Sequence, residues 1–170
     1  MELKTLFAGV AYTGNLPKGE ATLVTQDSRR AGPGAVFVCA KGHTTDGHAF
    51  AQKALEAGAS GIVVSNHGGR VLDHCPATAE VLPDIVDAVG GKMTILVDGA
   101  IRSGMDMFKA LALGADAVLI GRPFVTTVYG GGEEGVQLYV QKLKAELADT
   151  MRMCGAHSLA DIDRSMLYGF

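Results

Sequence analysis

The segment TILVDGAIRSGMDMFKALALGADAVLIGRP, Thr94 to Pro123, contains two aliphatic runs separated by a helical stretch. The runs at 94–99 and 116–122 are short and aliphatic, which is typical of strands. The stretch between them, GMDMFKALALG at 104–114, predicts a helix. A strand, a helix and a second strand in close succession predict a parallel β-α-β unit.

The same alternation continues on both sides of this unit. DGHAFAQKALEAG (46–58) predicts a helix capped by Asp46, and the β-branched run GIVVS (61–65) predicts a buried strand. PATAEVLPDIVDAVGG (76–91) predicts a helix that bends or restarts at its internal proline, and 132–155 predicts a long amphipathic helix.

Two further strand candidates lie within 20–42, with Gly32-Pro33-Gly34 as the turn between them. The sequence therefore predicts an α/β fold, in which a mainly parallel sheet of about five strands is flanked by helices and built from β-α units. A barrel interior fills at about eight strands, so we expect an open sheet with helices on both faces. The competing architecture is a half-barrel whose exposed edges drive the pairing of copies into a homo-oligomer.

The composition narrows the class of protein. The chain has 170 residues, 48% apolar and 19% charged, which suits one domain with a buried core. The net charge of −3 gives no general attraction to nucleic acid or to an anionic membrane. No apolar run approaches the roughly 18 residues that span a bilayer, and the N-terminus is too short and mixed for a signal peptide. Cys39, Cys75 and Cys154 form an odd, widely spaced set, which fits reduced thiols in a cytoplasmic protein.

Three turns that carry glycine or charge follow three consecutive strands: SNHGGR (65–70), DGAIRSG (98–104) and GRP (121–123). Carboxyl ends of parallel strands are where α/β folds bind ligands. In the last two turns a glycine backbone and an arginine, Arg102 or Arg122, form a phosphate cup, and the next helix adds its positive end. The alternative is that both arginines cap the sheet ends and pair with acidic residues.

The first of these turns places His67 between a strand and two glycines. A histidine titrates near neutrality and suits general-base chemistry, and Arg70 can hold a carboxylate. The alternative is a structural histidine, which is the commoner case for one isolated at a strand end. No metal site is predicted.

The segments GIVVSNHGGRVLDHCPATAEVLPDIVDAV, ILVDGAIRSGMDMFKALALGADAVLIGRP and GEEGVQLYVQKLKAELADTMRMCGAHSLADI resemble the FMN-dependent α-hydroxy acid oxidases and dehydrogenases. The resemblance covers 61–170 and corresponds to the last three β-α units of that family's eight-stranded barrel. It implies FMN as cofactor, a small 2-hydroxy acid as substrate, His67 as general base and Arg70 as carboxylate ligand. It further implies that the flavin and its phosphate are held by Ser65, Asp98, Gly99, Ala100, Ile101, Arg102, Gly121 and Arg122. Ala100 departs from the family's usual second glycine.

Residues 1–60 differ, and resemble the N-terminal domain of the Mur ligases. By that resemblance the DSR turn (27–29) and KGHTTDG (41–47) contribute to a uridine nucleotide site through Ser28, Gly42 and His43. No GKT or GKS phosphate loop occurs, so ATP-dependent ligation is not expected. The chain thus resembles a fusion of 1–60 and 61–170 packed as one domain.

The joint would fall in ALEAGASGIVVS (54–65), which is similar to ALALGADAVLIG (110–121). Such a helix–Gly-Ala–strand unit is also simply the common way for an α/β protein to end a helix and begin a strand. The flavin family's N1 lysine, base-orienting aspartate and substrate tyrosines lie in barrel segments outside the resemblance. We therefore expect weak or lost turnover. An inert fused or designed α/β domain and a UDP-binding remnant are the alternatives.

Overall fold

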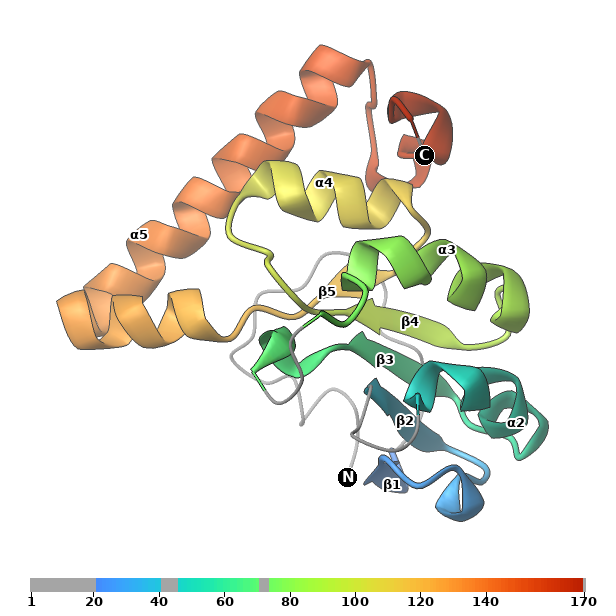
Figure 1. Ribbon diagram of the computed structural model, residues 1–170. Coiled ribbons are helices and arrows are strands. Elements are labelled where there is room, and N and C mark those ends of the chain that lie inside the picture. The colour runs from blue at the N-terminus through green and yellow to red at the C-terminus, as the bar shows by residue number, and fades with distance from the viewer. Residues whose placement is uncertain (1–20, 41–45, 71–73, 170) are drawn as a thin grey trace.

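A computed structural model describes residues 21–40, 46–70 and 74–169 of the chain. Within them, five strands form one sheet in the order β1-β2-β3-β4-β5, and every neighbouring pair is parallel (Figure 1). The strands are β1 (Leu23–Thr25), β2 (Ala35–Ala40), β3 (Gly61–Ser65), β4 (Thr94–Val97) and β5 (Ala117–Val118). The predicted parallel five-stranded sheet flanked by helices is confirmed.

The helices follow the strands in strict alternation from β2 onward. The α-helices are α2 (Ala51–Glu56), α3 (Thr78–Val89), α4 (Gly104–Ala112) and α5 (Arg122–Cys154). The short 3-10 turns are η1 (Ser28–Arg30), η2 (Gly47–Phe50), η3 (His67–Gly69), η4 (Leu159–Asp161) and η5 (Arg164–Met166). None of these helices in the described part of the chain is long and apolar enough to cross a bilayer.

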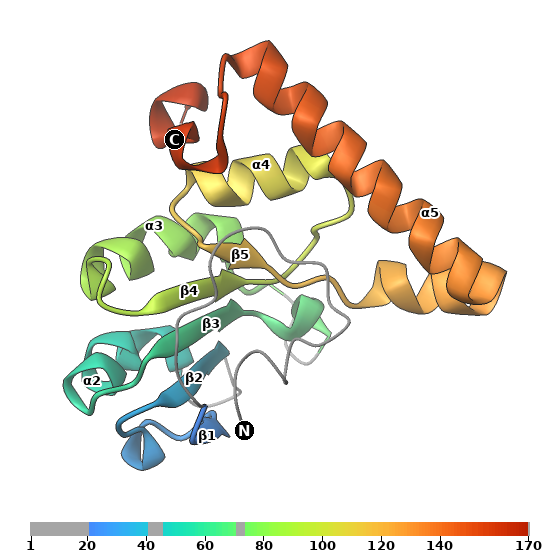
Figure 2. The same cartoon turned by 180° about the vertical axis from the view of Figure 1, so that it is seen from behind.

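The connecting helices α2, α3 and α4 all cover the same face of the sheet, which differs from the expected cover of both faces (Figures 1 and 2). The physical reason is the strand order. When each new strand is added on the same side of the previous one, right-handed crossovers place every helix on one face. The arrangement is that of the half-barrel, the competing architecture.

Burial differs between the two faces of the sheet. On the helix side, alternate strand residues are fully buried and pack against α2, α3 and α4: Phe37, Cys39, Ile62, Val64, Ile95 and Val97. Burying one large side chain of this kind contributes roughly 1.5–3 kcal/mol. On the opposite face Val36, Val38 and Leu96 are only half-buried. The helix-covered face therefore forms the main core.

The boundaries of two helices differ from the sequence prediction. The strand expected at 116–122 shortens to Ala117–Val118, and α5 already begins at Arg122 rather than near 132. Pro123 lies in the first turn of α5, where its fixed φ suits a helix start and its missing N–H costs nothing. The helix at 78–89 continues through Pro83, without the expected restart.

The long helix α5 consists of two parts. Gly132 interrupts it with a non-helical backbone (φ 53°, ψ −137°). The part before Gly132 projects beyond the strand ends, whereas the longer part after it packs along α4 (Figures 1 and 2). A second apolar cluster joins α4, α5 and the C-terminal turns through Phe108, Ala112, Leu147, Ala156 and Ile162. This packing places α5 beside the turn that follows β4.

Candidate functional site: the carboxyl edge of the sheet

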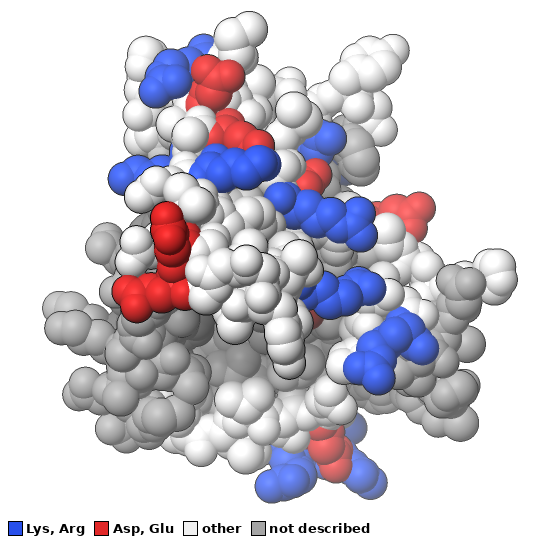
Figure 3. All heavy atoms as spheres, turned by 90° about the vertical axis from the view of Figure 1, so that its left-hand side faces the viewer, with Lys and Arg blue, Asp and Glu red and all other residues white. Residues whose placement is uncertain are grey.

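The three predicted ligand turns meet at the edge toward which the strands run. Figure 3 shows this side of the molecule, with basic side chains spread across it. Arg122 reaches the turn after β3, because a Cβ atom added to Gly68 would lie 3.1 Å from the Arg122 Cζ. The turns after β3 and β5 are therefore in direct contact, although β4 lies between their strands.

The turn after β3 is tied to the sheet through Ser65. The buried Ser65 hydroxyl donates to Asp98 Oδ2 at 2.9 Å and accepts from the His67 backbone N–H at 3.1 Å. Beyond that point the turn is exposed. His67 and the two glycines after it all have positive φ, at 55°, 66° and 69°. A non-glycine residue in this region is strained, so His67 has an unusual backbone at its predicted site.

The His67 imidazole is exposed, and no carboxylate of the described residues bonds to it. A carboxylate–imidazole pair does occur in another part of the same edge. His48 Nδ1 lies 2.7 Å from Asp46 Oδ1, next to β2. Asp46 therefore gives His48 the carboxylate partner that a general base needs, whereas His67, the predicted base, lacks such a partner among the described residues.

Asp98, at the end of β4, is the most tightly held member of the predicted site. Its carbonyl accepts from the Thr78 hydroxyl at 2.5 Å, and its Oδ2 accepts from Ser65. Its other carboxylate oxygen, Oδ1, is buried and has no hydrogen-bond partner among the described residues. A buried acceptor without a donor is costly, so this atom suits a ligand hydroxyl.

The two residues after Asp98, Gly99 and Ala100, both have a positive φ. Gly99 has φ 100°, and a Cβ there would lie 2.7 Å from the Thr78 hydroxyl oxygen. Ala100, where the resemblance predicts a glycine, has φ 61°. Its methyl group is therefore accommodated at the cost of backbone strain.

The start of α4 is not available to an anion, contrary to the predicted contribution of its positive end. Ser103 caps this helix by accepting from the Asp106 N–H at 3.1 Å, and Asp106 Oδ2 accepts from the Ser103 N–H at 3.0 Å. Glu146 of α5 then accepts from the Gly104 N–H at 2.9 Å. Lys142 also donates a hydrogen bond to Glu146. This bond, and after it the bond from the Gly104 N–H, lower the pKa of Glu146. The two carboxylates occupy the place an anion would take.

The start of α5 differs in each of these respects. No side chain caps it, and the space beside Gly121 is open. Arg102 and Arg122 are exposed and form no ion pair with any acidic side chain of the described residues. The alternative in which these arginines pair with acids is thus not what the structure shows. Two unpaired guanidiniums near an uncapped helix start suit a phosphate group.

The predicted uridine residues are only partly within the described chain. Ser28 is buried just beyond β1, in the turn that Asp27 caps. Arg29 hydrogen-bonds to Asp27 and lowers the pKa of that carboxyl to about 2. Gly42 and His43 lie outside the described residues. Among the residues that are described, no group of three or more His, Cys, Asp or Glu side chains could hold a metal ion.

Three residues of this edge were not predicted from the sequence: Thr78, Tyr139 and Glu146. Each contacts a predicted site residue or its neighbour from a helix that lies 20 to 42 positions away in the chain. Tyr139 and Glu146 lie on the face of α5 that packs against α4, together with the buried Leu143 and Leu147. Only the packing of α5 brings them to the turn.

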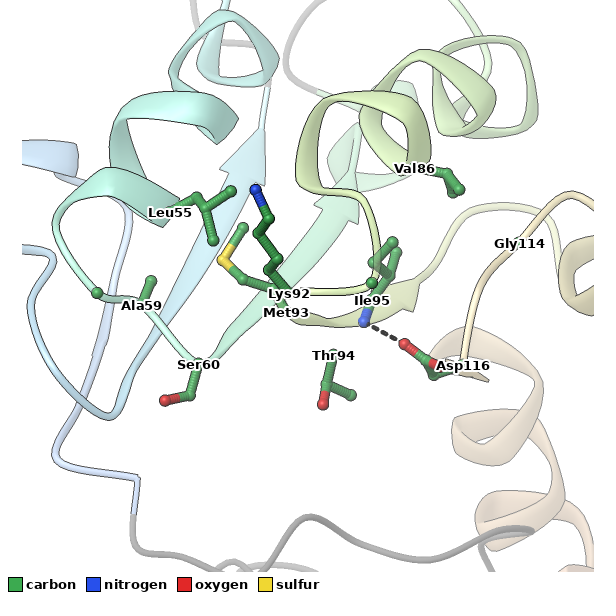
Figure 4. A pocket seen from close by; sticks show the side chains of 12 residues that line it. Leu55, Ala59, Ser60, Val86, Lys92, Met93, Thr94, Ile95, Gly114 and Asp116 are labelled. Atoms are coloured by element: carbon green, nitrogen blue, oxygen red, sulfur yellow. Dashed lines mark hydrogen bonds between the residues drawn. The ribbon is translucent and has the colours of Figure 1, made fainter.

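A cavity of about 620 Å³ lies at the opposite edge of the sheet (Figure 4). Its lining includes Leu55, Val86, Lys92 and Asp116. The Asp116 carboxylate accepts from the Ile95 N–H at 2.7 Å and so serves to join β4 to β5. None of the predicted site residues lines this cavity.

Residues 38–169 of the chain match the family model described as FMN-dependent dehydrogenase. The chain belongs to this family. It is 51% identical over 115 residues to a peroxisomal (S)-2-hydroxyacid oxidase of Arabidopsis thaliana, covering 68% of this chain and 32% of the relative. It is 49% identical over 122 residues to an L-lactate oxidase of a Roseobacter species, covering 72% and 33%.

The structural comparison agrees with the sequence comparison. The crystal structure of a mandelate oxidase superposes with a TM-score of 0.69 and 44% identity, covering 78% of this chain and 37% of the oxidase. This family member thus spans about a third of the length of these curated relatives. The family match begins at residue 38, upstream of the predicted boundary between 1–60 and 61–170. That boundary and the Mur-ligase resemblance of 1–60 stay predictions.

The family points to FMN as the cofactor, and the residues present fit its polar half. Asp98 Oδ1 offers a free acceptor to a ribityl hydroxyl, whereas Arg102 and Arg122 offer donors to the phosphate. The absence of a Cβ at Gly99 leaves room for the Thr78 hydroxyl, which bonds to the Asp98 carbonyl beside this site.

Proposed function

We propose that this chain is an FMN-binding module that holds the cofactor mainly by its phosphate and has weak or no 2-hydroxy acid turnover. The observation that carries the proposal is the pair of unpaired arginines, Arg102 and Arg122, beside the uncapped start of α5. The orphaned Asp98 oxygen, which needs a donor, supports the same ligand.

In this proposal the polar half of the site is shared among the turns after β3, β4 and β5. Asp98 binds a ribityl hydroxyl, and Ser65, which already bonds to Asp98, adjoins the flavin. The phosphate is bound by both arginines and by backbone donors of the two glycine turns, which comprise Gly99, Ala100, Ile101 and Gly121. FMN, when bound, would supply the two-electron acceptor of the family's chemistry.

The catalytic half of the proposal rests on His67 and Arg70. Arg70 would bind the carboxylate of a small 2-hydroxy acid, and His67 Nε2 or Nδ1 would take the proton of the substrate hydroxyl. Both side chains are exposed, and the imidazole has no carboxylate partner in the described part of the chain. A general base without an orienting partner loses orders of magnitude in rate, on the order of 10⁴-fold in one well-studied triad. Weak turnover follows from this geometry.

The decisive experiment is a titration of the purified chain with FMN, followed by quenching of flavin fluorescence. We expect saturable binding that weakens by roughly 10-fold or more in Arg102→Ala and in Arg122→Ala, since each loses charge-assisted bonds to phosphate. Arg152→Ala is the matched control, because Arg152 pairs with Asp149 near the far end of α5. Riboflavin, which lacks the phosphate, should bind weakly to all four proteins.

The inert-domain alternative predicts the opposite result. A colourless protein with a cooperative melt that does not shift with FMN or UDP-sugars would favour it. No binding at high micromolar FMN in the parent chain would exclude the FMN proposal.

A second candidate function is UDP binding by the segment that resembles the Mur ligases. It is favoured by Ser28, which is buried in the turn that follows β1. A UDP-dependent rise in melting temperature that disappears in Ser28→Ala supports this function, and no rise in the parent chain excludes it.

We further propose that copies of the chain associate through the sheet edges. β1 and β5 lie at the two ends of the strand order, and Val24 of β1 is 57% exposed. Light scattering during size-exclusion chromatography tests this association, and a monomer at all concentrations contradicts it.

A further inference from the structure

The backbone of Arg102 is held from two sides, whereas its side chain is not held by any described residue. Its N–H donates to Asp106 Oδ2 of α4 at 3.1 Å. Its carbonyl accepts from the Tyr139 hydroxyl of α5 at 2.9 Å. The guanidinium itself is exposed and forms no ion pair with the described residues. The two hydrogen bonds fix the peptide units on both sides of the Arg102 Cα atom. The Arg102 side chain therefore extends from a fixed backbone position.

Tyr139 also contacts the other arginine turn. Its ring packs edge-on against Phe124, with ring centroids 5.2 Å apart and an interplanar angle of 75°. Phe124 lies two residues after Arg122 in the first turn of α5. Edge-to-face pairs of this kind are directional. One side chain therefore bonds to the backbone of Arg102 and packs against the segment that carries Arg122.

The position of Tyr139 is set by the contact between α5 and the start of α4. A Cβ atom added to Gly104 would lie 2.5 Å from the Leu143 carbonyl oxygen and 2.6 Å from Glu146 Cβ. The Gly104 N–H donates to Glu146, which is also paired with Lys142. The backbones of α4 and α5 are thus in direct contact one turn from Tyr139, which positions this part of α5 against the start of α4.

We propose that Tyr139 is a positioning residue that sets the separation of the Arg102 and Arg122 guanidiniums for one phosphate monoester. The inference deepens the proposed function and rests on it for the identity of the ligand, which is FMN. The break at Gly132 explains why such a link is needed: the part of α5 that carries Arg122 meets the rest of the helix at a glycine. The Tyr139 contacts join the Arg102 turn to the segment of α5 that carries Arg122, across this break.

Burial raises the pKa of Tyr139, and this effect outweighs that of the nearby charges. The phenol therefore remains a proton donor to the Arg102 carbonyl throughout the neutral range. Its donation replaces a bond that water would otherwise make, so its contribution lies in fixing geometry.

The test compares FMN with riboflavin in the full chain, since a positioning role for phosphate acts on the first ligand only. Tyr139→Phe removes the hydroxyl and keeps the ring against Phe124. We expect FMN affinity to fall roughly 3- to 10-fold, riboflavin affinity to stay unchanged, and the melting temperature to change little. Tyr129→Phe is the matched control, because Tyr129 is 89% exposed on the same helix and should leave both affinities unchanged.

The outcomes separate this inference from the proposed function. If Tyr139→Phe weakens both flavins equally, or neither, the positioning role is overturned. If the parent chain does not bind FMN, the proposed function fails, and the amide signals of Arg102 and Arg122 are then followed by NMR during titration with inorganic phosphate. Phosphate binding that weakens in Tyr139→Phe supports the positioning role even then, and no phosphate binding in the parent chain overturns it.

Discussion

The turns after β3 and β4 are neighbours at one edge of the sheet, yet they are held very differently. The turn after β3 carries His67 and Arg70 on an exposed backbone with three consecutive positive φ values. The turn after β4 carries Arg102 on a backbone bonded by Asp106 of α4 and by Tyr139 of α5. The residues proposed to bind phosphate are therefore far better supported than those proposed for catalysis.

This difference shows that the two halves of a site depend on different parts of a fold. A phosphate site needs a few donors on adjacent turns, and the β4-α4-β5-α5 unit supplies both the turns and their support. A general base needs a carboxylate partner from elsewhere, and none of the described residues provides it to His67. Binding can thus persist where turnover does not.

Gly104→Ala should have the largest effect, because it separates the two helices that support the β4 turn. The new Cβ would meet backbone atoms of Leu143 and Leu147, which cannot move aside as a flexible side chain would. We expect a loss of about 3 kcal/mol or more in the free energy of unfolding, measured by urea denaturation. Gly131→Ala, where no atom lies within 4 Å of the new methyl, should change stability by less than about 1 kcal/mol. Equal losses in the two variants would show that α5 does not press on Gly104.

Gly68→Ala and Gly69→Ala form a pair that isolates the contact between the β3 turn and Arg122. Both glycines have nearly the same positive φ, so each alanine should cost roughly 1–2 kcal/mol of stability. Only the Gly68 methyl meets the Arg122 guanidinium; beside Gly69 there is nothing within 4 Å. We therefore expect FMN affinity, measured by fluorescence quenching, to fall about 10-fold in Gly68→Ala and to be retained in Gly69→Ala. Equal affinities would mean that Arg122 does not use this position when it binds phosphate.

Ala100→Gly should have the smallest effect and the opposite sign. Ala100 has φ 61°, which strains an alanine but not a glycine. The relief is partly offset by the greater freedom of glycine in the unfolded chain, so we expect a gain of about 0.5 kcal/mol in thermal or urea unfolding. Ala145→Gly, on an exposed helical position of α5, should instead lose about 1 kcal/mol. A loss at Ala100 as well would show that the turn does not adopt this backbone in solution.

The local features of this edge could be predicted from short stretches of sequence. GIVVS (61–65) is a buried strand, Asp46 caps η2 and Ser103 caps α4. Strand pattern and cap chemistry involve only neighbouring residues, so such features can be predicted locally. The glycine and arginine turns were placed at one edge for the same reason: parallel strands end together. The start of α5 at Arg122 was missed, since three glycines at 130–132 disguise the helix that precedes them.

What required the tertiary structure are the contacts between distant residues. The bond from Tyr139 to Arg102 spans 37 positions and that from Gly104 to Glu146 spans 42. The placement of α2, α3 and α4 on one face likewise depends on the order in which strands join the sheet. Sequence periodicity determines which elements form and which chemistry each turn carries, because those properties arise within a few residues. The packing of α5 on α4 determines which of those turns is rigid, because that support comes from side chains that no local pattern brings together.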